Sequence, residues 1–215
     1  MKLKLLLLGI TAVIGVFMIH SCSDDYYLEE GFESLAERRI TRSVAEPGDD
    51  SNTGEVENGP IFPTRNQIEN NAYIASKMEE AWSNTKKYCT PSGRREIAFY
   101  IYCNPRTGEI IEDVKFVIGD LIPNNPGVRT CVDVGGRDDT SESMACGVFH
   151  THTSLYHFNE SYSRGVGPSI QDRNTFNAQI MPCFVYDYKY GIDNTTPIDA
   201  PAMVRYYGKR RREVN

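Results

Sequence analysis

The chain has 215 residues and a formal net charge of −6, with 40% hydrophobic and 24% charged residues. This length is enough for one domain with a single hydrophobic core, and so acidic a chain lacks the basic surface with which proteins bind nucleic acid. The one basic run, Lys209 to Arg212, is better explained as a solvated tail than as a binding patch. We therefore expect no nucleic-acid partner.

Residues 1–21 have the features of a signal peptide. Two positive residues, Lys2 and Lys4, precede an apolar run, Leu5 to Ile19, that is too short to cross a membrane comfortably. A small residue then precedes Cys22. This arrangement resembles the signal of a bacterial lipoprotein, which implies that Cys22 is lipidated and becomes the N-terminus. An ordinary secretory signal or an uncleaved anchor is the alternative.

The residues around Cys22 also suggest a destination. Ile19 stands where lipoprotein signals usually have leucine. Ser23 resembles an outer-membrane address, and Asp24 and Asp25 resemble the surface-export signals of some bacterial groups. The resemblance implies an exported protein that its lipid holds at the outer membrane, on either the periplasmic or the surface face.

Two further regions follow the signal. Residues 22–60 are rich in Asp, Glu, Gly, Ser and Asn and show no apolar periodicity, which predicts a disordered tether. Residues 61–215 are predicted to form the folded domain, whose last element ends near Gly208.

The remaining cysteines are odd in number: Cys89, Cys103, Cys131, Cys146 and Cys183. One or two disulfides plus a free thiol would be compatible with export, and the connectivity stays open. Because none of them belongs to a Cys-x-x-Cys pair, we do not expect a zinc site built from thiolates.

The first half of the domain is predicted to contain a helix and a hairpin. Apolar residues recur at helical spacing over residues 66–88. Ile97–Cys103 is dense in aliphatic and aromatic residues, which indicates a buried strand. The turn residues 104–108 then predict a returning strand over Ile110–Ile118.

The second half is predicted to add strands and one helix. Residues 153–168 read as a long loop, of a length that is more often functional than passive. The predicted elements are strands Cys131–Val134 and Met144–His150, helix Ser169–Ile180, and strands Phe184–Tyr188 and Ala202–Tyr207. This order predicts an α+β domain with a mixed sheet flanked by helices.

The strongest functional signal is a pair of histidines followed by a serine and an aspartate. His150 and His152 stand in GVFHTHT, and Ser169 and Asp172 stand in GPSIQD. Side chains alternate along a strand, so both imidazoles should share one face with Cys146. Two imidazoles and a carboxylate are ligands that zinc prefers, and three protein ligands leave a position open, as in catalytic sites. Manganese or iron could also occupy such a set.

Simpler explanations exist for each of these residues. The histidines could be polar residues at a strand end, and Ser169 and Asp172 could merely cap a helix. In the long loop, His157 is expected to be an ordinary loop residue. The loop aromatics, Tyr156, Phe158 and Tyr162, could line a substrate groove.

The set Glu…H-x-H…S-x-x-D resembles the JAMM motif of the JAB/MPN metalloprotease superfamily, including its RadC-like members and JAB-related domains of exported bacterial proteins. The order of predicted elements is also similar, over about residues 64–208. The resemblance implies a JAB/MPN-like fold, related to that of cytidine deaminases. It also implies that His150, His152 and Asp172 bind zinc.

The resemblance assigns two further roles. Ser169 would hydrogen-bond the substrate oxyanion or the attacking water. Glu96, at the start of the first predicted core strand, would be the general base that passes a proton to the leaving nitrogen. Glu109 and Glu112 are rivals for this role, but they lie in the turn and the returning strand.

The chain departs from the family pattern in two places. The sixteen residues 153–168 make a longer spacing than is usual between the second histidine and the serine, and Thr153 replaces the common proline. Lengthening a loop costs little entropy, so the insertion is tolerable. It could bulge outwards or cover the cleft and restrict the substrates.

We therefore expect a zinc-dependent hydrolase that cleaves a peptide or isopeptide bond through a metal-activated water. Its substrate would be a peptide, a protein or a peptidoglycan-type amide. The alternative is a non-catalytic binding or effector module of the cell envelope that has the same fold.

Overall fold

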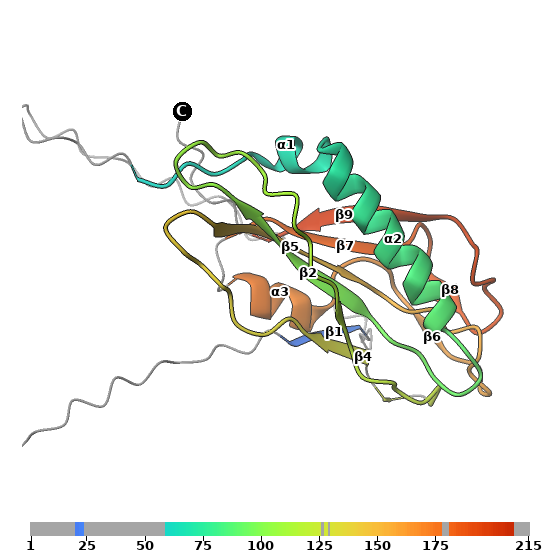
Figure 1. The fold of residues 1–215 in the computed structure, drawn as a ribbon. Helices are drawn as coiled ribbons and strands as arrows, with labels where there is room; N and C mark the ends of the chain where they lie inside the picture. The colour runs from blue at the N-terminus through green and yellow to red at the C-terminus, as the bar shows by residue number, and fades with distance from the viewer. Residues whose placement is uncertain (1–19, 24–58, 126, 129, 178–180, 209–215) are drawn as a thin grey trace, which may run out of the picture.

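The predicted α+β class with a mixed sheet flanked by helices is confirmed by the computed structural model (Figure 1), which describes residues 20–23, 59–125, 127–128, 130–177 and 181–208. The predicted basic tail, nearly all of the signal segment and most of the predicted tether lie outside these residues. No helix within the described residues is both long and apolar enough to cross a membrane.

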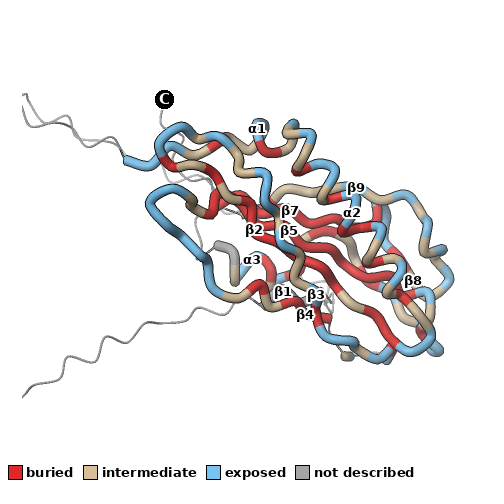
Figure 2. Tube along the Cα trace, viewed as in Figure 1, coloured by how far each residue is buried: buried red, intermediate tan, exposed pale blue. Residues whose placement is uncertain are grey.

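Five strands form the central sheet, in the order β3-β2-β5-β7-β9. They are β2 (Ile97–Cys103), β3 (Val117–Ile118), β5 (Met144–Thr151), β7 (Cys183–Tyr188) and β9 (Ala202–Tyr207). The β5–β7 pair is parallel, whereas the other neighbours are antiparallel. Strands β2, β5 and β7 are buried almost throughout, which explains their nearly continuous apolar sequence (Figure 2).

One face of the sheet is covered by the N-terminal helices. The single helix predicted over residues 66–88 is in fact two helices, α1 (Arg65–Glu69) and α2 (Ala72–Tyr88). Asn71 causes the break, because its side chain accepts a hydrogen bond from the Ile74 amide and caps α2. Helix α2 packs Trp82 against Tyr186, with stacked rings 4.9 Å apart.

The opposite face carries helix α3 (Ile170–Asn177) and a two-stranded sheet made of β1 (His20–Ser23) and β4 (Thr130–Asp133) (Figure 1). Strand β1 also contacts α3. The two faces enclose separate apolar clusters. Phe99 and Phe149 belong to the α2 side, and Ala98 and Val148 belong to the α3 side.

Strand β1 lies at the boundary between the predicted signal and the predicted tether, where no strand was predicted. It pairs antiparallel with β4, and Cys22 stands opposite Cys131 in the register. The other four cysteines are buried thiols: Cys89, Cys103, Cys146 and Cys183. Backbone pairing with an edge strand requires little of the side chains, so a polar segment such as HSCS can form it.

The predicted hairpin is only partly formed. After the turn, the chain touches β2 at the Cys103–Ile110 bridge and again at β3, but residues 112–116 form no strand. One cause is a side-chain contact from α2, because the Val114 amide donates to the Tyr73 hydroxyl at 3.1 Å.

A β-bulge changes the predicted alternation along β5. The register with β2 shifts between Ile101 and Tyr102, which lie opposite Gly147 and Ala145 respectively. Cys146 therefore packs into the cluster on the α2 side, and the prediction that it shares a face with the histidines is wrong.

The long loop of residues 153–168 is packed against the domain rather than projecting from it. Residues 153–155 are buried, and a short strand, β6 (Ser163–Arg164), pairs with β8 (Ile192–Asp193). Phe158 is only 5% exposed, and Cζ of the Arg94 guanidinium lies 4.5 Å from the centre of the Phe158 ring. The first residues of the loop and Phe158 are thus buried in the domain, whereas residues 159–161 are exposed, and Phe158 is not a groove residue.

Candidate metal centre

The two histidines project from the end of the central strand β5. His150 pairs with Ala98 of β2 and with Val185 of β7, and the His152 amide donates to the Tyr186 carbonyl at 3.0 Å. Between them, Thr151 faces the other way, with its hydroxyl 2.6 Å from that of Thr85 in α2. This alternation turns both imidazoles to one face of the sheet, as the sequence predicted, and that face carries α3.

Helix α3 brings the carboxylate to the histidines. Ser169 and Asp172 cap the helix reciprocally, because the Asp172 amide donates to Ser169 Oγ at 3.1 Å and the Ser169 amide donates to Asp172 Oδ2 at 2.7 Å. The capping explanation is therefore correct for both residues. It does not compete with metal binding, because the cap is what holds Asp172 Oδ2 facing the imidazoles.

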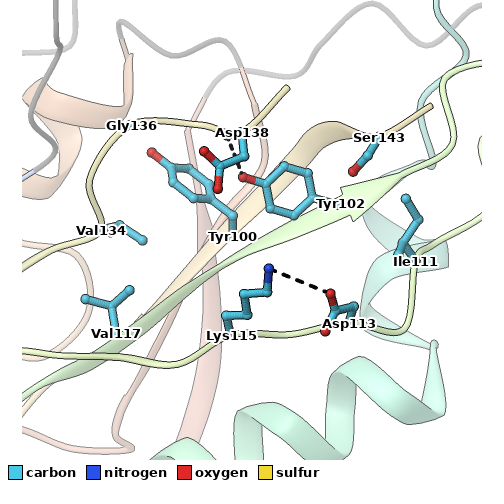
Figure 3. Close-up of a pocket in the computed structure, with 10 residues that line it drawn as sticks. All are labelled: Tyr100, Tyr102, Ile111, Asp113, Lys115, Val117, Val134, Gly136, Asp138 and Ser143. Atoms are coloured by element: carbon cyan, nitrogen blue, oxygen red, sulfur yellow. Dashed lines mark hydrogen bonds and ion pairs between the residues drawn. The ribbon is translucent and has the colours of Figure 1, made fainter. Parts of the chain in front are cut away.

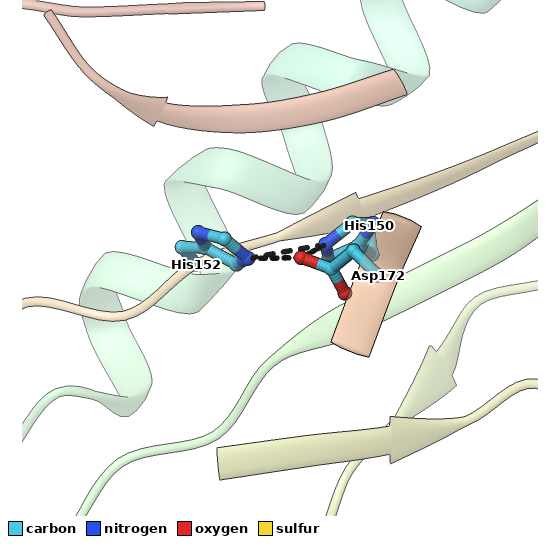
Figure 4. A group of neighbouring side chains, drawn as sticks. All are labelled: His150, His152 and Asp172. Carbon is cyan, nitrogen blue, oxygen red and sulfur yellow. Dashed lines mark hydrogen bonds and ion pairs between the residues drawn. The ribbon is translucent and has the colours of Figure 1, made fainter. Parts of the chain in front are cut away.

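Three potential ligand atoms form a small triangle (Figure 4). His150 Nε2 and His152 Nε2 are 3.2 Å apart, and Asp172 Oδ2 lies 3.4 Å from the first and 3.2 Å from the second. In a tetrahedral zinc site with bonds of about 2.0–2.1 Å, ligand atoms are about 3.3 Å apart. The spacing of these three atoms thus fits a zinc ion.

His152 is held from behind by a buried aspartate that the sequence analysis did not single out. Asp187, in β7, lies 3.1 Å from His152 Nδ1 through its Oδ2 atom. Arg164 donates to both oxygens of this carboxylate at 2.9 Å, and the Gly167 amide donates to it at 2.8 Å. The carboxylate fixes the ring so that Nε2 faces the ligand triangle, as supporting carboxylates do in metal sites.

His150 has a different partner. The hydroxyl of Tyr207, in β9, lies 3.3 Å from His150 Nδ1. Burial and the negative charge of Asp172, with a smaller contribution from Glu96, raise the pKa of Tyr207 well above its ordinary value. Tyr207 is therefore a neutral partner, and both carboxylates lie within electrostatic range of its hydroxyl.

Glu96 lies just before β2, at the position that the sequence predicted, and is fully buried. Its Oε1 accepts a hydrogen bond from the Thr130 hydroxyl in β4 at 2.7 Å. Because Ala98 pairs with His150, alternation places Glu96 on the same face of the sheet as the histidines. The rival carboxylates Glu109 and Glu112 are exposed.

The charges of the site are tightly coupled. Burial alone would lower the pKa of His152, but the charges of Asp187 and Asp172 outweigh it and raise this pKa from 6.5 to about 10. Burial alone would raise the pKa of Asp172, but His150 and His152 hold it well below its ordinary value. In the same way, Arg164 and His152 outweigh burial and lower the pKa of Asp187. Both carboxylates therefore stay ionised, and Asp172, whose contacts with His150 and His152 bring no permanent positive charge, favours a bound cation.

Among the described residues, His150, His152 and Asp172 are the group that could hold a metal ion, and neither His157 nor a cysteine joins them. The prediction of a cofactor site is confirmed to this extent, and the identity of the metal stays a prediction. Asp187 had a weak signal in the sequence, as the single charge within the apolar run CFVYDY, whereas Arg164 had none.

Comparisons with known proteins add no assignment: no protein-family model, curated protein or solved structure matches this chain. The resemblance to the JAB/MPN superfamily therefore stays a proposal that rests on the motif and the geometry.

We predict that the purified chain binds about one zinc ion and that a His150→Ala/His152→Ala double variant binds none, because two of the three ligands are lost. Elemental analysis after dialysis against zinc measures the content. His157→Ala, which removes an imidazole outside the triangle, is the matched control. A folded parent chain that takes up no metal would contradict the assignment.

Asp187→Asn should weaken zinc binding by about 10- to 100-fold, because the amide supports His152 less well and leaves Arg164 without its charge partner. Competition with a chromophoric chelator measures the affinity. Asp199→Asn is a suitable control, since its side chain is 85% exposed and lies in a surface ion pair with Lys86. Equal affinities for the two variants would show that Asp187 does not support the ligand.

The metal-free protein should be most stable between about pH 4 and 6.5. The raised pKa of His152 stabilises the fold fully below 6.5, and this contribution is lost as the pH rises towards 10. The lowered pKa values of Asp172 and Asp187 contribute above about 3.8 and are lost in more acidic solution. Melting temperatures in a chelator should follow this profile, and added zinc should restore stability at pH 8. A flat profile would contradict the charge coupling.

Proposed function

We propose that this domain is a zinc-dependent hydrolase of the JAB/MPN type that cleaves a peptide or isopeptide bond. The observation that carries the proposal is the buried His150–His152–Asp172 triangle, whose dimensions fit zinc and which shares a sheet face with the buried carboxylate of Glu96. Zinc would supply Lewis-acid chemistry, polarising a carbonyl and making water nucleophilic near neutral pH.

The chain's own residues would carry the proton and the developing charge. Glu96 would take a proton from the attacking water and deliver it to the leaving nitrogen as the amide bond breaks. The Thr130 hydroxyl, which donates to Glu96 Oε1, would hold this carboxylate in place. Ser169 Oγ accepts from the Asp172 amide, and its own O–H could donate to the oxyanion.

A second candidate is supported by the burial of the site. The side chains of His150, His152 and Asp172 are at most 2% exposed, which is also what a purely structural metal site would show. In that case the domain would be a non-catalytic binding or effector module. Glu96 separates the two candidates, because a structural metal would not require a second buried carboxylate on the same face of the sheet.

The cellular context that we propose follows from the N-terminal sequence. Cys22 would carry a lipid, and the protein would be exported to the outer membrane, facing the periplasm or the surface. Envelope proteins, peptides and peptidoglycan-type amides are the substrate classes available in that compartment.

Glu96→Gln should reduce hydrolysis by at least about 100-fold while zinc content and fold stay unchanged, because a general base contributes about 10²- to 10⁴-fold. A panel of labelled peptide and isopeptide substrates, read by mass spectrometry, measures the turnover. Glu112→Gln is the control, since Glu112 is exposed. If the zinc-loaded parent chain cleaves no substrate in the panel, and if it and Glu96→Gln bind these peptides with equal affinity, the result would favour the non-catalytic binding module over the hydrolase.

A further inference from the structure

A cavity of about 330 Å³ lies beside strand β2 (Figure 3). Its walls include Tyr100, Tyr102, Lys115, Val117, Val134 and Asp138. Tyr100 belongs to the apolar cluster that also contains Ala98, the partner of His150 in the register. The cavity and the metal centre thus lie on one face of the central sheet.

The walls of the cavity are held in place by their polar ends. The Tyr100 hydroxyl donates to the Gly135 carbonyl at 3.1 Å, and the Asp138 amide donates to the Tyr102 hydroxyl at 3.0 Å. The two rings are 6.0 Å apart in an edge-to-face arrangement. With their hydroxyls engaged, the tyrosines offer ring surface beside Val117 and Val134, which suits an apolar or aromatic guest.

The charged groups of the cavity lie towards solvent. Lys115 Nζ is 3.9 Å from Asp113, and both side chains are more than 70% exposed. These groups form a polar rim around an aromatic and aliphatic floor. A ligand with a polar backbone and one apolar side chain would fit this cavity, because its backbone would contact the polar rim and its side chain would contact the apolar floor.

Strand β4 runs from Glu96, the proposed general base, to the cavity. At one end, the Thr130 hydroxyl contacts Glu96, and just beyond the other end Val134 lines the cavity. Glu96, just before β2, and Tyr100, within it, are four positions apart, which corresponds to about 13 Å of extended chain. A ligand that reaches both places must therefore be extended.

An extended chain already lies along this path in the structure. Strand β1 pairs with β4 from Ser23, opposite Thr130, to His20, opposite Asp133. It also contacts α3, the helix that begins with the metal-centre residues Ser169 and Asp172. The outer edge of β4 thus accepts a backbone, with the C-terminal end of the accepted segment near Glu96.

We propose that the cavity is a specificity pocket for an apolar or aromatic side chain of an extended polypeptide substrate. The substrate backbone lies antiparallel along the outer edge of β4, in the place of β1, and the bond to be cleaved lies about four residues C-terminal to the bound side chain. This inference rests on the proposed hydrolase function and narrows its substrate to polypeptides.

Binding of a labelled peptide with the sequence VFMIHSSS tests the pocket without requiring turnover. It copies residues 16–23 with serine in place of Cys22, so it carries apolar residues ahead of the segment that pairs with β4. The protein is the unprocessed chain, residues 1–215, kept from export so that β1 stays intact in the parent, and the variant is Ser21→Pro/Cys22→Pro. Adjacent prolines remove an amide directed at β4 whichever of the two amides points that way. Fluorescence anisotropy should show at least about tenfold tighter binding to this variant than to the parent, whose own segment competes.

Substitutions in the cavity then locate the bound side chain. In the proline background, Tyr102→Ala should weaken binding about tenfold, whereas Tyr102→Phe, which keeps the ring, should not. Val117→Arg, which fills the cavity from a half-buried position, is a second variant should Tyr102→Ala fail to fold. A second peptide has serines in place of the first four residues of VFMIHSSS. Its affinity for the proline variant should be as low as the affinity of VFMIHSSS for the same variant carrying Tyr102→Ala.

The binding measurements test the pocket independently of the proposed hydrolase activity. His150→Ala/His152→Ala in the same background should bind the peptide like its parent, because the pocket does not need the metal. Equal binding by Tyr102→Ala and Tyr102→Phe, or no saturable binding to the proline variant, would overturn the pocket. Loss of zinc or of turnover with intact peptide binding would overturn only the hydrolase.

Discussion

Two carboxylates, Asp172 and Asp187, are buried on either side of one imidazole, and the architecture of the site depends on how their charge is balanced. Arg164 neutralises Asp187 with two hydrogen bonds, so this pair needs nothing further. Asp172 contacts both histidines and the Ser169 amide at the start of α3, and none of these groups has a permanent positive charge. A proton on an imidazole or a divalent cation in the triangle can supply the missing charge, and the two compete.

The long loop owes its place in the fold to the same balance. Its buried end carries Arg164, which also donates to the Thr153 carbonyl at 2.8 Å, and Gly167, whose amide reaches Asp187. The loop therefore closes on itself around the carboxylate that orients His152. A family-like spacing between the second histidine and the serine would leave no room for this arginine. The long connection between His152 and Ser169 thus supplies the groups that hold the carboxylate behind His152.

The sequence predicted the ligands but not their supports, for a physical reason. His150, His152 and Asp172 were recognisable because strand alternation and a helix cap are local rules that spacing reveals. Asp187 acts on His152 across a parallel strand pair, and Tyr207 acts on His150 from β9, so their roles depend on sheet order.

The errors in the predicted fold have the same origin. The strands of the central sheet were found from their apolar runs, whereas β1 was missed because its pairing depends on the backbone of β4. The break before α2 depends on one asparagine cap, and the incomplete hairpin reflects a tyrosine of α2 that competes for a backbone amide. Cys146 was assigned to the wrong face because one bulge reverses an alternation that is otherwise regular.

The parallel pairing of β5 with β7 has a consequence for how the protein acquires its metal. A parallel pair needs a crossover, and here the crossover contains the loop and α3, so Asp172 reaches His150 only when the whole connection is in place. Contacts between residues this far apart in the sequence form late in folding, because closing the intervening loop costs conformational entropy before the contact is made. A nascent chain would hold at most the two neighbouring imidazoles, a poor site, and would gain its third ligand as the sheet closes. The metal ion would then bind after the chain has folded. A chain with a bound metal would therefore be one in which the connection between β5 and β7 has already formed.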